Sequence, residues 1–499
     1  MVMEGLRANA LLVALMGGLL TYVWRVQDLF PALVAIRLLE IFSIAVPALF
    51  LLDRRAQLQA TAALRRPLTK VVLLLALMAA VSVPTSLWPG MSLVYLMKNL
   101  LPAIALLLAV AGAISSLMDV RRFVWMQVLG ATLYAAIILT RFDIGQDGRL
   151  GSLVFYDAND LGMLLVCTVP FTIYLARHAR GAVPRVLAIG ALVLCLLTIV
   201  KTGSRGAFLG LLAVSIYLVF RFASVHMTTR LLTVAVVVGA LVIGAGGKYW
   251  TMMGTLLNPT EDYNWVGKES GGRMMVWGRG IGYMEARPFS GVGLGAFSMA
   301  EGTISPLAAQ QSYGNGLKWS AAHNSFVQIG AELGVPGLIL FVAIVGLTFR
   351  TAARLARDAL AHAPPDIPVA GLASAHAAVV VGFAVSGFFL SQAYSLYLYF
   401  VVGMVIGLDI VVRKRWRASG HRAGAIAPAR AGRAVPFGDA RQVAAQRARW
   451  RRWWTSFQGW RHDKCRRTST RFDQFSRATP DSMNRRAGRH MPRVTASAR

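Results

Sequence analysis

The sequence has few charged residues and few cysteines. Only 15% of its 499 residues are charged, whereas a soluble chain of this length usually carries more charge, divided among several domains. Cys167 and Cys195 each lie within an apolar block, and Cys465 lies near the C-terminus. In these positions the three cysteines indicate neither a disulfide framework nor a zinc site.

Hydrophobic residues make up 56% of the chain and form long blocks, such as 68–88 and 183–200. About 20 apolar residues in a helix cross the hydrocarbon core of a bilayer, where the backbone must satisfy its own hydrogen bonds. The sequence therefore predicts an all-α polytopic membrane protein with about twelve transmembrane helices. The predicted spans are residues 8–24, 30–51, 69–87, 94–115, 122–140, 158–176, 184–200, 205–220, 231–249, 324–348, 370–390 and 394–412.

Residues 1–24 resemble a signal peptide. They lack a clear small-x-small cleavage site, however, and many further spans follow them. We therefore expect a retained first helix.

Basic residues divide unequally between the two sets of short loops that alternate along the chain. One set carries fifteen: Arg54, Arg55, Arg65, Arg66, Lys70, Arg121, Arg122, Arg177, Arg180, Arg185, Arg221, Arg230, Arg350, Arg354 and Arg357. The other set carries five: Arg25, Arg141, Arg149, Lys201 and Arg205. Since cytoplasmic loops are enriched in Lys and Arg, the first set and both termini are predicted to be cytoplasmic.

A long loop, about 251–322, lies between the ninth and tenth predicted spans and is therefore predicted to be outside. The loop breaks any symmetry of six plus six helices, and no internal repeat is visible. Both features weaken the interpretation of the chain as a transporter with two related halves.

The net charge of +30 is concentrated at the C-terminus. From Arg413 onward the chain has 23 Lys and Arg against 4 Asp and Glu, so this segment contributes 23 − 4 = +19. Basic charge that flanks spans reflects membrane orientation, and no nucleic-acid partner is predicted.

We expect residues 1–412 to form the membrane domain and residues 413–499 a disordered cytoplasmic tail. Binding of the tail to the membrane surface stays open, because it contains Trp450, Trp453, Trp454 and Trp460.

Two outer segments lie at helix ends. In the segment 149–160, Asp157 or Asn159 is suited to cap the sixth helix, while Arg149 could contact a phosphate or pair with Asp157. The second segment is the tight turn Lys201-Thr-Gly-Ser-Arg-Gly206. Lys201 and Arg205 put two cations where an anionic headgroup would lie, and a guanidinium fits phosphate oxygens; the alternative is an interfacial anchor.

The long loop contains a predicted surface helix. Met274, Trp277, Ile281 and Met284 recur at helical spacing before Pro288. Near this helix, Arg273, Arg279 and Arg287 are candidate contacts for a ligand or for lipid phosphates. The glycine run at 291, 293 and 295 follows no strand, so a nucleotide-binding loop is excluded.

The tenth predicted span begins at His323-Asn324. A neutral imidazole is the natural general base near pH 7, and Asn324 is suited to cap the helix; a histidine that only caps or packs is the alternative. Glu332 lies nine residues further on, about 180° around a helix, so we expect it to face a partner on another helix rather than His323. Asp28 is alone, and Asp157 with Asp160 is explained by the helix start, so neither a metal nor another cofactor is predicted.

Together these segments resemble the family of O-antigen ligases and O-antigen or exopolysaccharide polymerases, which are bacterial membrane glycosyltransferases. The resemblance covers roughly residues 30–412. It rests on Thr202-Gly-Ser-Arg-Gly206, on Arg273 and Trp277 with Pro288-Phe-Ser-Gly-Val-Gly293, and on His323-Asn324 with Glu332, Gly334 and Gly337. Asp157-Ala-Asn-Asp-Leu161 is similar to the family's Asp-Pro-Asn segment, with Ala158 in place of proline.

The resemblance implies transfer or polymerisation of a glycan carried on undecaprenyl diphosphate, at the periplasmic face of the bacterial inner membrane. The implied acceptor is a hydroxyl of a glycan or of the lipid A core, and contacts with membrane lipid and other polysaccharide assembly proteins are also implied. His323 would act as the base of an inverting, metal-independent reaction. Arg205 and Arg273 would bind the diphosphate, assisted by Lys201 and Arg279. Ser204, Asn324, Glu332, Asp157 and Asn159 would support the site.

Two other functions remain open from the sequence. A transporter or flippase would move a lipid-linked polysaccharide without forming a glycosidic bond. A non-catalytic assembly factor would tolerate loss of all the outer-face residues.

Overall fold

The computed structural model describes residues 2–142, 150, 156–221, 227–258, 265, 272–308 and 319–425, and within these ranges the chain is helical with no β-strand. The chain divides into one compact unit at Met1–Arg422 and a second at Ala423–Arg499. The helices are α1 (Val2–Tyr22), α2 (Val26–Leu29), α3 (Pro31–Val34), α4 (Leu38–Leu52), α5 (Arg54–Leu64), α6 (Pro67–Ser82), α7 (Pro89–Tyr95), the π-helical η1 (Leu96–Leu100), α8 (Leu101–Ala113), α9 (Leu117–Arg141), α10 (Ala158–His178), α11 (Ala182–Thr202), α12 (Arg205–Arg221), α13 (Met227–Gly244), α14 (Gly247–Gly254), α16 (Arg273–Ala286), α17 (Phe297–Thr303), α18 (Ser325–Ala361), α19 (Ile367–Gly387) and α20 (Leu396–Ala425).

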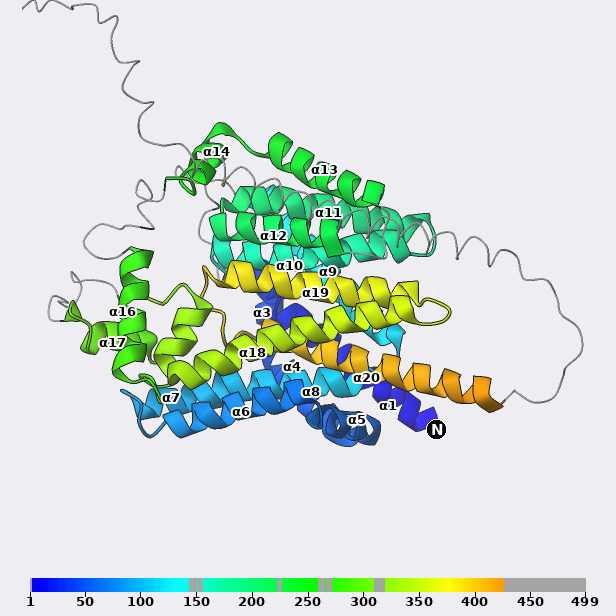
Figure 1. Ribbon diagram of the computed structural model, residues 1–499, viewed down its shortest axis with the longest axis horizontal. Helices are drawn as coiled ribbons and strands as arrows, with labels where there is room; N and C mark the ends of the chain where they lie inside the picture. Colours follow the sequence, from blue (N-terminus) through cyan, green and yellow to red (C-terminus); the bar gives the residue numbers. More distant parts are fainter. Residues whose placement is uncertain are drawn as a thin grey trace, which may run out of the picture. The chain divides into compact units, whose positions relative to one another are not determined.

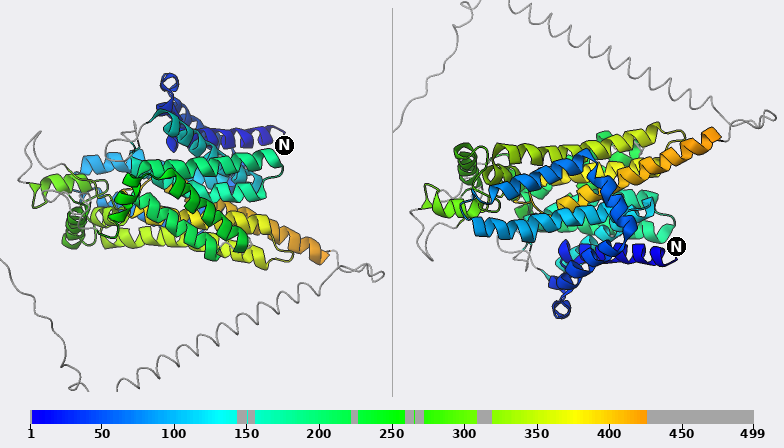
Figure 2. Two further views of the ribbon diagram at one scale, coloured as in Figure 1. Left: turned by 90° about the horizontal axis from the view of Figure 1, so that it is seen from above. Right: turned by 90° about the horizontal axis from the view of Figure 1, so that it is seen from below.

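The long helices of the first unit run back and forth between two ends of a bundle (Figure 1). One end carries α16 and α17, and the views from above and below place both helices beyond that same end (Figure 2). The other end carries the N-terminus and the turn between α18 and α19 (Figure 1). We call these the loop end and the terminal end.

Seven described helical segments are long and apolar enough to cross a membrane, judged by length and composition. They are Pro89–Ala113, Leu117–Arg141, Ala158–His178, Ala182–Thr202, Ser325–Ala361, Ile367–Gly387 and Leu396–Ala418. Shorter apolar helices at Ala10–Tyr22, Leu38–Leu52 and Pro67–Ser82 coincide with three further predicted spans. The predicted all-helical membrane class is therefore confirmed, and the number of twelve spans stays a prediction.

Several boundaries differ from the sequence-based prediction. The predicted span 30–51 is interrupted at Arg37, which has a left-handed φ of 54° directly before α4. The predicted span 231–249 is divided into α13 and α14. α20 continues past residue 412 to Ala425, since Arg413 pairs with Asp409 one turn earlier at 2.5 Å and good helix formers follow.

The centre of the bundle is formed by α10, α19 and the apolar part of α20, most of whose side chains are buried. α12 packs closely on α19 because Gly210 has no side chain. A Cβ at Gly210 would lie 2.1 Å from Ser386 Oγ, and the Ser386 hydroxyl donates to the Gly206 carbonyl at 3.4 Å. Small residues permit such close helix contacts in membrane proteins. This contact fixes the start of α12 relative to the end of α19.

Candidate active site

The start of α12 presents Arg205 at the loop end. Gly203 ends α11 with a left-handed φ of 60° and turns the chain sharply. The buried Ser204 hydroxyl accepts a hydrogen bond from the Ala207 amide at 3.2 Å and so caps α12. Arg205 follows, half-buried, and its Nη1 donates to Thr255 Oγ1 at 2.7 Å. The guanidinium therefore reaches the residue that follows α14.

Lys201 is engaged at the end of a neighbouring helix. Its ammonium donates to the carbonyl of Ile138, at 2.9 Å, and to that of Phe142. Carbonyl groups at a helix C-terminus lack intrahelical partners and carry partial negative charge, so a lysine is a favourable partner for them. Lys201 thus ties the end of α11 to the end of α9.

An aromatic cluster of Trp277, Phe388 and Phe389 lies among three parts of the site. The Trp277 ring lies 5.2 Å from Phe388 and 6.3 Å from Phe389, measured between centroids. The Trp277 indole N–H donates to the Ala322 carbonyl at 2.9 Å. A Cβ on Gly206 would lie 3.1 Å from Phe389 Cβ. The cluster therefore links α16, the residue before His323 and the residue after Arg205.

Arg273 is the first residue of α16, about one turn before Trp277, and it is half-buried. The side of α16 that faces the protein carries Val276, Trp277, Gly280 and Tyr283. Met274 and Ile281, two of the apolar residues at the predicted spacing, are exposed instead. In Figure 1, α16 runs across the direction of the long helices at the loop end.

His323 lies directly before α18 on an unusual backbone. Its φ is 46°, in the left-handed region that non-glycine residues rarely adopt. Its amide donates to Ser391 Oγ at 2.9 Å, and its side chain is exposed. Asn324 is buried and caps α18, because its Oδ1 accepts from the amides of Phe326 at 2.9 Å and Val327 at 3.1 Å.

The segment between α19 and α20 joins the α18 start to the α10 start. The Ser325 hydroxyl donates to the Leu390 carbonyl at 2.7 Å and accepts from the Gln392 amide at 3.0 Å. The Gln392 side-chain amide in turn donates to Asp160 Oδ1 at 2.7 Å. In the sequence this segment is only a short loop between two predicted spans, so Ser391 and Gln392 were not predicted as site residues.

Asp157 caps α10. Its Oδ1 accepts from the amides of Asn159 and Asp160, both at 2.7 Å, and Asn159 Nδ2 donates to Asp157 Oδ2 at 3.2 Å. Capping, one of the two roles considered for this segment, is thus its geometry in the structure. Arg149 lies outside the described residues.

Glu332 is buried and holds the glycine-rich turn against α18. Its carboxylate accepts from the amides of Gly295 at 3.0 Å and Phe297 at 3.4 Å. The turn fits into a break in α18 at Gly334, where φ is 70° and a Cβ would lie 2.4 Å from the Pro288 carbonyl oxygen. The glycine run also serves close backbone packing, since a Cβ at Gly291 would lie 2.3 Å from the Glu332 carbonyl carbon.

Arg279 forms a buried ion pair with Glu301 of α17. Its Nε and Nη2 donate to the two carboxylate oxygens at 2.9 and 2.5 Å, and the Tyr283 hydroxyl donates to the same carboxylate at 2.7 Å. The hydrogen bond to Glu301 raises the pKa of Arg279, and burial together with the carboxylate raises that of Tyr283. Arg279 thereby connects α16 to α17. Arg287, by contrast, is half-buried and donates to a backbone carbonyl at 3.3 Å.

A cavity of about 330 Å³ adjoins these segments. Ser391, whose hydroxyl accepts a hydrogen bond from the His323 amide, lines this cavity. Its polar lining includes Lys98, Asn99, Asp160 and Gln392. Five tyrosines also line it: Tyr22, Tyr95, Tyr156, Tyr394 and Tyr397. Lys98 lies on η1, and π-helical turns often occur at functional sites. A charged residue inside a predicted span was the signal that could have identified Lys98.

Within the described ranges, no group of three or more His, Cys, Asp or Glu side chains is arranged to hold a metal ion. The cationic and imidazole groups of the site come instead from the starts of three helices, α12, α16 and α18.

Residues 190–342 match the family model described as O-antigen ligase. This part of the chain is therefore similar to O-antigen ligases. The matched segment includes Lys201, Arg205, Arg273, Arg279 and His323, whereas Asp157 and Asn159 precede it. No curated protein matches the chain. The O-antigen ligase assignment supports, at a coarse level, a membrane enzyme that transfers a glycan from a lipid carrier to an acceptor.

Proposed function

We propose that the protein transfers a glycan from undecaprenyl diphosphate to an acceptor hydroxyl at the periplasmic face. The acceptor oxygen attacks the anomeric carbon, the bond between that carbon and the diphosphate oxygen breaks, and undecaprenyl diphosphate leaves. The acceptor proton goes to the His323 imidazole. Attack opposite the leaving group inverts the anomeric configuration.

The observation that carries this proposal is the convergence around Trp277, Phe388 and Phe389. The cluster contacts the residue after Arg205 and the residue before His323, and it lies one turn from Arg273. Two guanidinium groups and one imidazole are thus presented from the same end of the bundle. Negative charge develops on the departing diphosphate, and guanidinium groups stabilise such charge most in a partly desolvated site.

The tyrosine-lined cavity is suited to sugar units of the acceptor or of the donor glycan. Tyrosine rings offer flat apolar faces together with hydroxyl groups, and Asp160 and Gln392 add hydrogen-bonding groups. A site with mostly apolar walls and a few directed polar groups is typical for small ligands. Ser391 would connect an occupied cavity to the backbone of His323.

The roles of the arginines can be tested by glycan transfer with purified Arg205→Ala and Arg273→Ala proteins. Loss of one group that stabilises the transition state costs about 10²–10³ in rate. The matched control is Arg141→Ala, which removes an exposed arginine at the end of α9 and which we expect to retain activity. Rates near wild type for both test variants would reject the diphosphate-binding role.

Movement of the lipid-linked glycan between leaflets without a new glycosidic bond would favour a flippase.

The reaction is proposed to need no metal. We expect full transfer after treatment with EDTA, because the two arginines would supply the positive charge that a divalent ion often provides. Loss of activity that added Mg²⁺ or Mn²⁺ restores would contradict this part of the proposal.

A further inference from the structure

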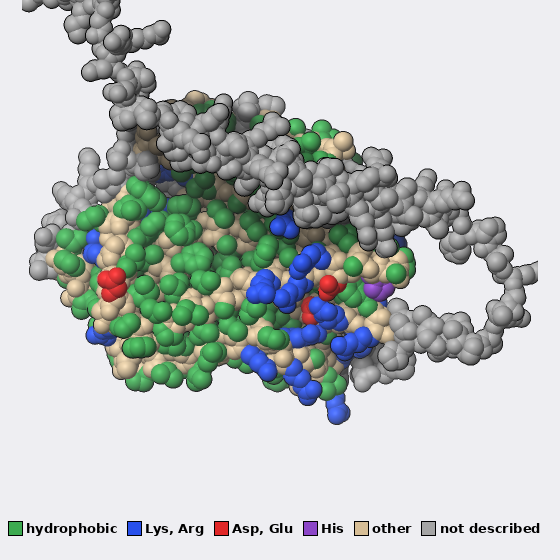
Figure 3. Space-filling view, in the orientation of Figure 1, with side chains coloured by type: hydrophobic (Ala, Val, Ile, Leu, Met, Phe, Trp, Pro, Cys, Tyr) green, Lys and Arg blue, Asp and Glu red, His purple; other side chains and the backbone are tan. Residues whose placement is uncertain are grey.

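A second concentration of charge lies at the terminal end, away from the proposed glycan site. Figure 3 shows Lys and Arg side chains gathered on this part of the molecule, whereas hydrophobic side chains cover much of the rest of the visible face. Its arginines come from the turn between α5 and α6, from α18 and from α20. We call the following five residues the arginine cluster: Arg65, Arg66, Arg354, Arg413 and Arg417.

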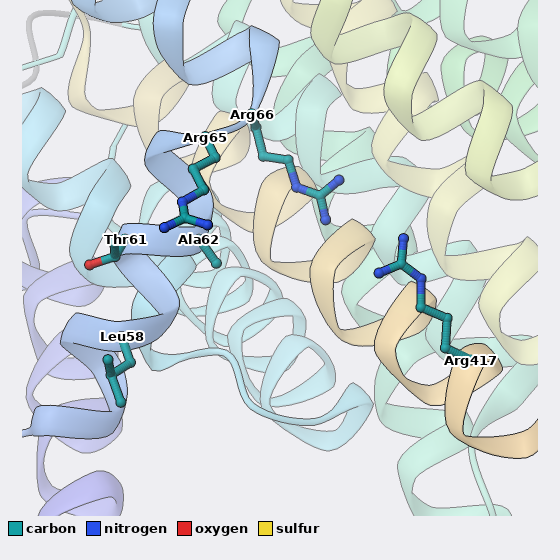
Figure 4. Close-up of a pocket in the computed structure, with 6 residues that line it drawn as sticks. All are labelled: Leu58, Thr61, Ala62, Arg65, Arg66 and Arg417. Atoms are coloured by element: carbon teal, nitrogen blue, oxygen red, sulfur yellow. The ribbon is translucent and has the colours of Figure 1, made fainter. Parts of the chain in front are cut away.

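The arginine cluster lines two cavities. One has a volume of about 470 Å³ and is lined by Arg65, Arg66 and Arg417 together with Leu58, Thr61 and Ala62 (Figure 4). The other has a volume of about 390 Å³, and Arg66 and Arg417 line it together with Arg354 and Arg413. Because Arg66 and Arg417 line both cavities, the cavities adjoin. Figure 4 shows the guanidinium groups of Arg66 and Arg417 pointing toward each other across the gap between α20 and the turn after α5.

Carboxylates neutralise only part of this charge. Asp409 lies 3.1 Å from Arg66 and 2.5 Å from Arg413, and Asp358 lies 3.5 Å from Arg413. Arg65 and Arg354 make no ion pair with any carboxylate in the described part of the chain. Arg65 and Arg354 therefore add positive charge that no described carboxylate offsets, and a bound anion would reduce the repulsion between them and the neighbouring guanidinium groups.

The position of α5 indicates where that anion comes from. In Figure 1 this helix is seen end-on while the long helices run across the page, and the view from below also shows it crossing their direction (Figure 2). Leu58 on α5 is 67% exposed and lines the first cavity, and Leu51 and Leu52 just before α5 are also exposed. A helix that lies across the bundle end with exposed leucines is typical of the boundary between headgroups and acyl chains.

We propose that the arginine cluster binds an acidic membrane phospholipid that carries two phosphodiesters, with one phosphate in each cavity. A guanidinium presents a planar pair of N–H donors that matches phosphate oxygens, and five such groups surround the two adjoining cavities. Leu58 would contact the glycerol and the first carbons of an acyl chain. The bias of basic residues toward one membrane face explains their presence at this end, but it does not require five arginines from three elements to line shared cavities. This binding site is independent of the proposed glycan transfer.

The test is lipid binding by the purified full-length protein, measured by native mass spectrometry with added diphosphatidylglycerol, phosphatidylglycerol or phosphatidylcholine. The test variant is Arg65→Gln/Arg354→Gln, which removes one arginine from each cavity without breaking an ion pair to Asp409. The control is Arg180→Gln/Arg185→Gln, which removes the same charge from exposed positions around the turn between α10 and α11, at the same end of the bundle. We expect the test variant to bind diphosphatidylglycerol at least about tenfold more weakly and the control to bind it like the wild type.

Equal affinity of the wild type and the test variant would overturn the proposal, as would equal affinity for phosphatidylcholine. The assignment of two phosphates would be overturned if, at the same total phosphate concentration, phosphatidylglycerol bound as tightly as diphosphatidylglycerol. If the double variant does not fold, the wild type still gives an answer. Its affinity for diphosphatidylglycerol should fall steeply between 0.1 and 0.5 M salt, and affinity that does not change with salt would contradict a site built on arginines.

Discussion

His323 is the residue on which the proposed chemistry depends most, and its backbone is itself unusual. His323 has a φ of 46°. Two contacts hold this backbone conformation: the Ser391 hydroxyl accepts a hydrogen bond from the His323 amide, and Asn324 caps the following helix. Residues in sparsely populated backbone regions persist where surrounding contacts determine them, and they cluster at functional sites. The exposed imidazole is thereby presented from a fixed backbone.

Ser391 is expected to position His323 rather than to contact the substrate's reacting atoms. Ser391→Ala should lower kcat about fivefold with a smaller change in KM, since the lost hydrogen bond contributes about 1 kcal/mol. The measurement is steady-state transfer with the purified variant, and Thr61→Ala, at an exposed position on α5 that does not line the tyrosine-lined cavity, is the control. Unchanged kcat would show that the Ser391 contact does not support the base.

The residue types in the sequence identified the helix caps and the candidate cations, but they did not reveal which side chains and backbone groups are hydrogen-bonded or paired in the fold. Lys201 and Arg279 illustrate the difference. From the sequence both were candidate phosphate contacts, yet in the structure Lys201 donates to carbonyls at the end of α9 and Arg279 pairs with Glu301. These partners lie at sequence separations that no local pattern encodes.

The ion pair of Arg279 gives a prediction that separates stability from catalysis. Its side chain is 11% exposed and that of Glu301 is 4% exposed, so Arg279→Ala would leave a buried carboxylate without its cationic partner. We expect a loss of about 3–5 kcal/mol in unfolding free energy. Arg279→Met/Glu301→Leu should recover most of this loss, because it removes both charges. Thermal unfolding and donor affinity of the two variants are to be measured; normal stability with weakened donor binding would instead assign Arg279 to the diphosphate.

At the scale of elements, the contact between α12 and α19 determines where Arg205 lies. Gly210 allows this contact, because a Cβ there would lie 2.1 Å from Ser386 Oγ. Gly210→Val should therefore separate the two helices, lower unfolding free energy by about 1–3 kcal/mol and reduce glycan transfer through displacement of Arg205. Gly190→Val is the matched control, since a Cβ at Gly190 has no neighbour within 4 Å among the described residues. Equal stability and activity of the two variants would contradict this account of the packing.

Hydropathy predicted the long helices well and their interruptions poorly. Each long apolar block became a helix, because lipid leaves the backbone no other partner. The break before α4 at Arg37, the π-helical turn containing Lys98 and the break in α18 at Gly334 were not predicted. At Gly334 the cause is tertiary: the segment at Pro288 occupies the break, with its carbonyl accepting the Val335 amide at 2.8 Å.

At the scale of the whole molecule, the bundle separates two kinds of basic residue. The loop end carries Arg205 and Arg273, at the starts of α12 and α16, whereas the terminal end carries the arginine cluster. The distribution of basic residues predicts that the loop end faces the periplasm and the terminal end the cytoplasm.

This orientation can be measured by labelling single cysteines with a maleimide that does not cross membranes. In a background without Cys465, Leu257→Cys, at an 87% exposed position of the loop end, should react in intact cells whose outer membrane is permeable. Arg180→Cys at the terminal end should react only after the inner membrane is opened. The buried Cys167 and Cys195 should stay unlabelled in both cases. The reverse pattern would place the proposed site on the cytoplasmic face and contradict the choice of donor and compartment.

The central claim is that an imidazole beside a cationic, membrane-surface site accepts the acceptor proton during glycan transfer. The most direct measurement is the single-turnover rate of transfer by purified His323→Ala, with correct folding and donor binding checked separately. Removal of a general base predicts a rate about 10²–10⁴ times lower, with donor binding retained. Transfer at nearly the wild-type rate would show that His323 is not the base, and the proposed mechanism would be wrong.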